Sequence, residues 1–207
     1  AKAPRARANG LGGAYDPEIY HLWQWTDPVM KRIGIYGGSF DPIHLGHLLL
    51  AESAREELGL DQVIFVPAKQ SPLKHNSPLV AGDERLKLIE LSIQDHPFFS
   101  LSTVELERKP PSYTVDTLRY FRVRYPDDEL YLLLGQDALC DLEQWHCFHD
   151  LFLLARIAVG ARPGFPPAIP AALRQYERPS AHSRGIVFFA NPLIEIITSS
   201  DPEVRNR

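Results

Sequence analysis

The stretch IGIYGGSFDPIHLGHLLLAESAREELG (residues 33–59) decides how this chain folds. It opens with a short apolar run, turns through Gly37 and Gly38, and passes Asp41-Pro42 into a segment with apolar residues at helical spacing. A strand that leads through a glycine turn into a helix is typical of an α/β unit. The glycines let a ligand approach the backbone, and the free amides and positive dipole end of the helix suit a phosphate. We therefore expect a phosphate site at the carboxyl edge of the first strand.

The rest of the chain repeats this alternation of apolar runs and amphipathic segments, as in strands that are covered by helices on both faces. We expect an α/β fold with a single doubly wound, mostly parallel sheet of Rossmann-like type and flanking helices. The expected strands are Ile33–Tyr36, Gln62–Val66, Phe98–Leu101, Glu129–Leu134, Arg156–Val159 and Ile186–Phe189. The expected helices are Leu48–Leu58, Asp83–Ile93 and Thr114–Tyr125, with Asp83 and Thr114 as caps.

The composition is that of a globular protein and excludes several classes of function. With 207 residues, 44% of them hydrophobic, the chain can bury one sizeable core rather than two comparable ones. A formal net charge of −4 gives no overall positive field for a nucleic acid or an anionic membrane, so we expect neither as a partner. Cys140 and Cys147 lack the spacing of a disulfide framework or a zinc site, and no protein metal ligands are expected. No apolar run reaches the roughly 20 residues that span a bilayer, so we expect a soluble, cytoplasmic protein.

The first 29 residues differ in character from the rest. They are basic and aperiodic at first, end in a short aromatic stretch, and contain no apolar core of a secretory signal. Met30, the single methionine, stands directly before the first expected strand. We interpret Met30 as the natural start, residues 1–29 as a disordered or accessory extension, and residues 30–207 as the folded domain.

Two histidines stand at the expected start of the first helix. His44 and His47 are three residues apart and can point to one side. A pair of imidazoles beside free amides can bind a polyphosphate and stabilise the charge that develops in a transition state. The alternative is that the glycines only make a tight turn and the histidines only cap or pack the helix.

The whole string GGSFDPIHLGH (residues 37–47) resembles the signature of the nucleotidyltransferase superfamily that shares the HxGH motif. The segments KPPSYTVDTL (109–118) and LLLGQDALCDLEQWH (132–146) are similar to those of bacterial nicotinate-nucleotide adenylyltransferases. These enzymes make deamido-NAD from ATP and nicotinate mononucleotide in NAD biosynthesis. The resemblance runs from about Met30 to about Ser200 and implies a nucleotidyltransferase domain.

The resemblance also implies a reaction and a set of site residues. The 5′-phosphate of nicotinate mononucleotide would attack the α-phosphorus of ATP in line and release pyrophosphate, with Mg²⁺ on the triphosphate. The implied catalytic residues are His44, His47 and Arg205. The implied ATP-binding residues are Gly37, Gly38, Ser39, Phe40, His44, His47, Ser199, Ser200 and Arg205. The implied nicotinate nucleotide-binding residues are Lys74, His75, Tyr113, Thr114, Asp137 and Trp145.

The sequence departs from the family pattern at two places. In the loop SPLK (71–74) a leucine replaces the customary histidine of PPHK, and His75 follows instead. At the end, ITSSDPEVRNR (197–207) places Arg205 about one position beyond the arginine of the family's ISSTxIR-like motif. From the resemblance we expect a domain without the family's usual C-terminal helix.

Several alternatives therefore stay open at this point. Lys74 and His75 could belong to a solvated basic loop, and Trp145 could be a core aromatic. The chain could be a nicotinamide mononucleotide or phosphopantetheine adenylyltransferase, or a catalytically impaired nucleotide-binding protein. The sequence permits a homo-oligomer without indicating one.

Overall fold

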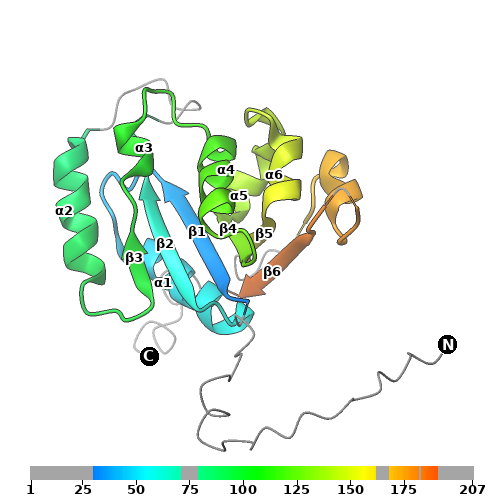
Figure 1. Cartoon of the computed structure of the whole chain (residues 1–207), viewed down its shortest axis with the longest axis horizontal. Coiled ribbons are helices and arrows are strands. Elements are labelled where there is room, and N and C mark those ends of the chain that lie inside the picture. Colours follow the sequence, from blue (N-terminus) through cyan, green and yellow to red (C-terminus); the bar gives the residue numbers. More distant parts are fainter. Residues whose placement is uncertain (1–29, 71–78, 162–167, 182, 191–207) are drawn as a thin grey trace, which may run out of the picture.

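The fold is centred on one parallel sheet (Figure 1). A computed structural model describes residues 30–70, 79–161, 168–181 and 183–190. Within them the strands are Arg32–Gly38 (β1), Gln62–Pro67 (β2), Phe99–Leu101 (β3), Glu129–Gly135 (β4), Arg156–Ala161 (β5) and Ile186–Ala190 (β6). Every neighbouring pair is parallel, in the order β3-β2-β1-β4-β5-β6. The expected strands and the doubly wound parallel sheet are confirmed, because the chain builds one half outward from β1 and the other outward from β4.

Helices cover both faces of this sheet. They are Leu45–Leu58 (α1), Gly82–Ile93 (α2), Val104–Glu107 (α3), Thr114–Arg124 (α4), Gln136–Cys140 (α5) and Phe148–Leu154 (α6), with 3₁₀ turns at Leu142–Gln144 and Ala171–Tyr176. Alternate side chains of β1 enter two separate cores. Ile33 and Ile35 join the core that contains residues of α4 and α6, whereas Tyr36 joins the core that contains residues of α1 and α2. Among the described residues, no helix is long and apolar enough to cross a bilayer.

Helix α1 begins three residues earlier than the expected Leu48. His44 has an extended backbone (φ −148°, ψ 170°) and is the residue that precedes the helix, and its carbonyl accepts from the amides of His47 at 2.9 Å and Leu48 at 3.4 Å. The helix ends as expected at Gly59, whose left-handed backbone (φ 61°) is readily adopted by glycine. The earlier start places His44 directly before the helix and His47 in its first turn.

The prediction that Asp83 and Thr114 cap their helices was wrong. Ala81 precedes α2 and Tyr113 precedes α4, both with extended ψ angles, so Asp83 and Thr114 lie inside the first turns. Asp83 nevertheless stabilises α2, because the helix dipole is positive at this end and interacts favourably with an acidic side chain.

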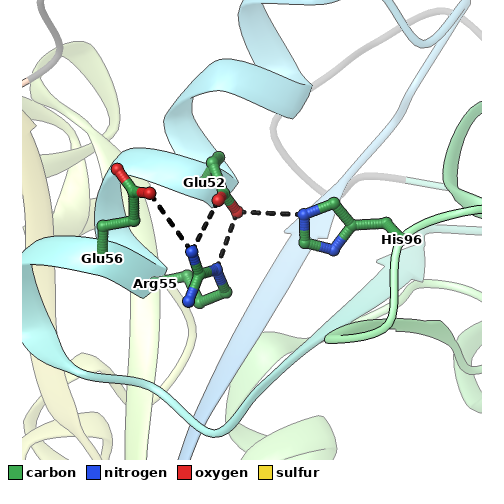
Figure 2. A network of polar contacts seen from close by, with 4 residues as sticks. All are labelled: Glu52, Arg55, Glu56 and His96. Atoms are coloured by element: carbon green, nitrogen blue, oxygen red, sulfur yellow. Dashed lines mark hydrogen bonds and ion pairs between the residues drawn. The ribbon is translucent and has the colours of Figure 1, made fainter.

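A polar network holds α1 against the turn before β3 (Figure 2). Arg55 donates two hydrogen bonds to the carboxylate of Glu52, at 2.8 and 2.7 Å, and reaches Glu56 at 3.3 Å. His96 lies 3.2 Å from a Glu52 oxygen and stacks on Phe99, with ring centroids 3.6 Å apart. The network therefore joins the histidine-bearing helix to the outer part of the sheet.

Candidate active site

A cavity of about 340 Å³ opens where the strand order reverses, between the carboxyl ends of β1 and β4. This switch point is where open α/β sheets bind ligands, because the following loops diverge to opposite faces. The main contributing segments are Tyr36–Ser39, Ser112–Thr114, Leu132–Gly135, Trp145 and His146. Strand ends therefore form the floor, and segments that lead into helices form the walls.

The two histidines at the start of α1 form a stacked pair. The ring centroids of His44 and His47 are 3.7 Å apart, and the rings are inclined by 25°. The backbone N–H of His44 donates to Nδ1 of His47 at 3.2 Å, so in the neutral ring the proton is on Nε2. His47 lines the cavity, whereas the His44 side chain is exposed beside it. The expectation that both point to one side is confirmed.

The glycine turn brings bare backbone to the cavity. An added Cβ at Gly38 would lie 3.0 Å from the ring of Phe40, so a side chain there would press on that ring, whereas Gly37 faces open space. Phe40 is 1% exposed and packs edge-on against His47, with centroids 5.0 Å apart. Its side chain therefore packs under the turn and next to His47, and Phe40 itself does not line the cavity.

A buried arginine that the sequence analysis missed fixes this turn. Arg85 of α2 donates to the carbonyl oxygens of Ser39 at 2.6 Å, Ala68 at 2.9 Å and Val80 at 3.1 Å. Asp41 accepts from the Val80 amide at 2.9 Å. These bonds tie the glycine turn to the end of β2 and to the segment that precedes α2. In the sequence Arg85 is one charged residue of an amphipathic helix, and nothing local marks it as buried.

The opposite wall presents an indole and a helix start. Tyr113 and Thr114 line the cavity where α4 begins, and the amides of its first residues have no acceptor within the helix. Trp145 lines the same cavity and also packs against the core, so the two interpretations of this residue are compatible. Its Nε1 is buried and has no hydrogen-bond partner among the described residues. The ring of His146 lies over that of Tyr113, with centroids 4.2 Å apart.

A second residue that the sequence analysis missed is Glu105, which is 4% exposed and lines the cavity. The hydroxyl of Thr117 donates to its carboxyl at 2.6 Å, and Arg108 lies 3.7 Å away. Burial raises the pKa of Glu105, and the bonds from Thr117 and Ser112 act in the opposite direction. Ser112 in turn accepts from the amide of Lys69 at 3.2 Å. Glu105 thus connects the start of α4 with the loop that follows β2.

The structure brings together seven of the predicted site residues. The residues that line the one cavity are Gly37, Gly38, Ser39, His47, Tyr113, Thr114 and Trp145. Asp137 is exposed in the first turn of α5, beside the lining residues Gly135 and Ala138. The predictions for Lys74, His75, Ser199, Ser200 and Arg205 lie outside the described residues. Within the described ranges, no three His, Cys, Asp or Glu side chains are grouped as metal ligands.

Comparison with known proteins assigns the chain to a family. Residues 35–202 match the cytidylyltransferase-like family model, and the chain belongs to that family of nucleotidyltransferases. A probable nicotinate-nucleotide adenylyltransferase of Herpetosiphon aurantiacus is 47% identical over 147 residues, which are 71% of this chain and 74% of the relative. Another, from Thermomicrobium roseum, is 40% identical over 178 residues, 86% of this chain and 80% of the relative. Within the wider family, the chain belongs with these nicotinate-nucleotide adenylyltransferases.

The fold itself is shared with a more distant solved structure. The nicotinic acid mononucleotide adenylyltransferase of Plasmodium falciparum, complexed with NaAD, superposes with a TM-score of 0.60 at 20% identity. The match covers 77% of this chain and 75% of the Plasmodium chain.

Proposed function

We propose that this chain transfers the adenylyl group of ATP to nicotinate mononucleotide, giving deamido-NAD and pyrophosphate in NAD biosynthesis. The observation that carries the proposal is the construction of the cavity. One wall has bare backbone and a histidine at the start of α1, and the other has an indole and the start of α4. A dinucleotide product needs two adjoining subsites of these two kinds.

The α1 wall suits the triphosphate. Gly37, Gly38 and Ser39 line the cavity and can offer their main chain, and α1 begins beside it, with the positive end of its dipole at that start. The Nε2–H of His47 can donate to a phosphate oxygen whose charge grows in the transition state. The backbone N–H of His44 donates to Nδ1 of His47, which leaves the proton of the neutral ring on Nε2. Ser199, Ser200 and Arg205 remain predicted contacts to the same phosphates.

The α4 wall suits the pyridine nucleotide. The face of Trp145 can stack on an electron-poor pyridinium ring, and the amides at the start of α4 can hold the ring carboxylate. Tyr113 and Thr114 would contact the ring, and Asp137 the ribose. Lys74 and His75 remain predicted contacts to the nucleotide phosphate.

The reaction then depends on positioning rather than on a protein nucleophile. The 5′-phosphate oxygen of nicotinate mononucleotide forms a bond to the α-phosphorus, and the bond from that phosphorus to the pyrophosphate oxygen breaks. Mg²⁺ arrives on the triphosphate as part of the substrate and is held by phosphate oxygens and water. Glu105 is the one carboxylate of the lining among the described residues. It accepts a hydrogen bond from Thr117, so we assign it to holding the cavity wall and not to binding the metal ion.

We place this activity in the cytoplasm, where the free Cys140 and Cys147 stay reduced. The partners that we propose for the cavity are the substrates ATP and nicotinate mononucleotide. The oligomeric state stays open.

The proposal is tested by pyrophosphate release from ATP and Mg²⁺, with nicotinate mononucleotide or nicotinamide mononucleotide in separate reactions. We expect release with the acid and little with the amide. Both oxygens of the ring carboxylate can accept from the backbone amides at the start of α4, whereas the NH2 group of a carboxamide is a donor and cannot. Equal release with both contradicts the proposed selectivity. A folded protein that binds both nucleotides and releases nothing is a binding protein and not this enzyme.

A further inference from the structure

Tyr36 presents a hydroxyl to the cavity that the ATP and nicotinate subsites described above leave unused. It is the last buried residue of β1, is 7% exposed and belongs to the cavity lining. Its ring is held by two aromatic neighbours: it meets Phe40 edge-on at 5.4 Å and lies 5.5 Å from Phe65. In the part of the chain that the structure describes, its hydroxyl makes no hydrogen bond, and its oxygen keeps some accessible surface although the residue as a whole is buried.

A hydroxyl at a cavity surface bonds to whatever fills the cavity, which is water or a ligand. The packing of the ring does not explain the oxygen, because a phenylalanine would make the same contacts with Phe40 and Phe65. The oxygen is therefore placed to bond to a ligand that occupies the cavity. Burial also raises the pKa of the Tyr36 phenol, so at neutral pH it remains a neutral donor.

The neighbours of Tyr36 indicate which substrate supplies the partner. The ring of His47, which also lines the cavity on the α1 wall, has its centroid 6.2 Å from that of Tyr36, and Gly37 and Gly38 follow directly in the chain. Trp145 and the start of α4, which suit the pyridine nucleotide, belong to the opposite wall. Phosphate oxygens are strong acceptors, and they match the donors that we assign to the α1 wall, which are main-chain amides and the Nε2–H of His47.

We propose that the Tyr36 hydroxyl donates a hydrogen bond to a phosphate oxygen of the bound nucleoside triphosphate, next to the oxygen that His47 contacts. The proposal rests on the proposed function, since that function places ATP on this wall. It makes Tyr36 a binding residue for one substrate only.

The test is Tyr36→Phe, which removes one oxygen and keeps the ring. We expect the melting temperature to stay the same or rise, because no described residue loses a bond. We expect the Kd for a non-hydrolysable ATP analogue and the KM for ATP to rise about tenfold or more, as for a lost bond to a charged oxygen. The KM for nicotinate mononucleotide should not change. Tyr131→Phe is the control for nucleotide binding, because Tyr131 is 3% exposed on the neighbouring β4 but does not line the cavity. Its hydroxyl bonds to Glu129 and Arg156, so this variant should lose some stability and leave the KM for ATP unchanged.

Three results would overturn the proposal. The first is a melting temperature that falls by several degrees while ATP binding is unchanged, which would show that the hydroxyl has a structural partner. The second is a variant that is indistinguishable from the wild type in every measurement. The third is a rise in the KM for nicotinate mononucleotide instead of ATP. Failure of the proposed function is recognised separately, because the wild-type protein would then fail to form product or to bind the ATP analogue.

Discussion

Replacing His47 with alanine removes the imidazole that links the start of α1 to the cavity. Two separate losses follow from its contacts. Nδ1 no longer accepts from the backbone N–H of His44, and Nε2 no longer offers a donor to the phosphates. The two losses differ in size, so stability and activity measurements can separate them.

The stability loss is small. The bond to His44 lies at an exposed helix start, where such an acceptor contributes about 1 kcal/mol. For a domain of this size that lowers the melting temperature by about 2–4 °C. The activity loss is larger, because removal of one donor to a developing oxyanion typically costs about 100- to 1000-fold in rate, or about 2.7–4 kcal/mol.

The assay is kcat/KM for pyrophosphate release at 25 °C, with the melting temperature recorded on the same preparation. His47→Gln is the control, because a glutamine at this position of a first turn can reach back to the preceding amide and preserve stability. We expect its melting temperature to match that of the wild type while its rate stays far below. A folded His47→Ala protein with kcat/KM within threefold of wild type would refute the assigned role.

Three further variants test other parts of the site and fold. Glu105→Gln should raise the melting temperature at neutral pH, because burial raises the pKa of Glu105 and ionisation then costs stability. The difference should disappear as the pH falls below about 4.3, where the carboxyl is neutral in both folded and unfolded chains, and a lower melting temperature at every pH would contradict this reading. Glu52→Gln should lower stability by about 0.5–1 kcal/mol at pH 7. The bond from Arg55 holds the pKa of Glu52 down, so this loss should fade below about pH 4, and an equal loss at all pH values would show that charge is not involved. Trp145→Ala should raise the KM for nicotinate mononucleotide about 10- to 100-fold with little change for ATP, and equal effects on both substrates would remove the stacking role.

The sequence predicts the framework because its signals are local. Each expected strand is a short apolar run, and the motif from Gly37 to His47 is contiguous, so the turn, the helix start and the switch point follow from neighbouring residues. That Tyr113, Thr114 and Trp145 line the same cavity also follows from short segments, which the fold brings to one sheet edge, whereas their contacts to a substrate stay predictions.

The residues that the sequence did not reveal act at a distance. Arg85 bonds to carbonyl groups 46 and 17 residues away, and only the packing of α2 against the sheet brings them within reach. Glu105 and Tyr36 resemble an ordinary helix carboxylate and an ordinary strand aromatic until their burial beside the cavity is known. The caps were misplaced for a related reason, because the loops before α2 and α4 set where those helices begin.

The most direct test of the central claim is to identify the product. The protein is incubated with ATP, Mg²⁺ and nicotinate mononucleotide, and the dinucleotide and pyrophosphate are separated and quantified by chromatography with mass detection. The account predicts deamido-NAD and pyrophosphate in equal amounts, with neither formed when one nucleotide is omitted. Pyrophosphate without the dinucleotide, or no product from a folded protein that binds both substrates, would contradict it.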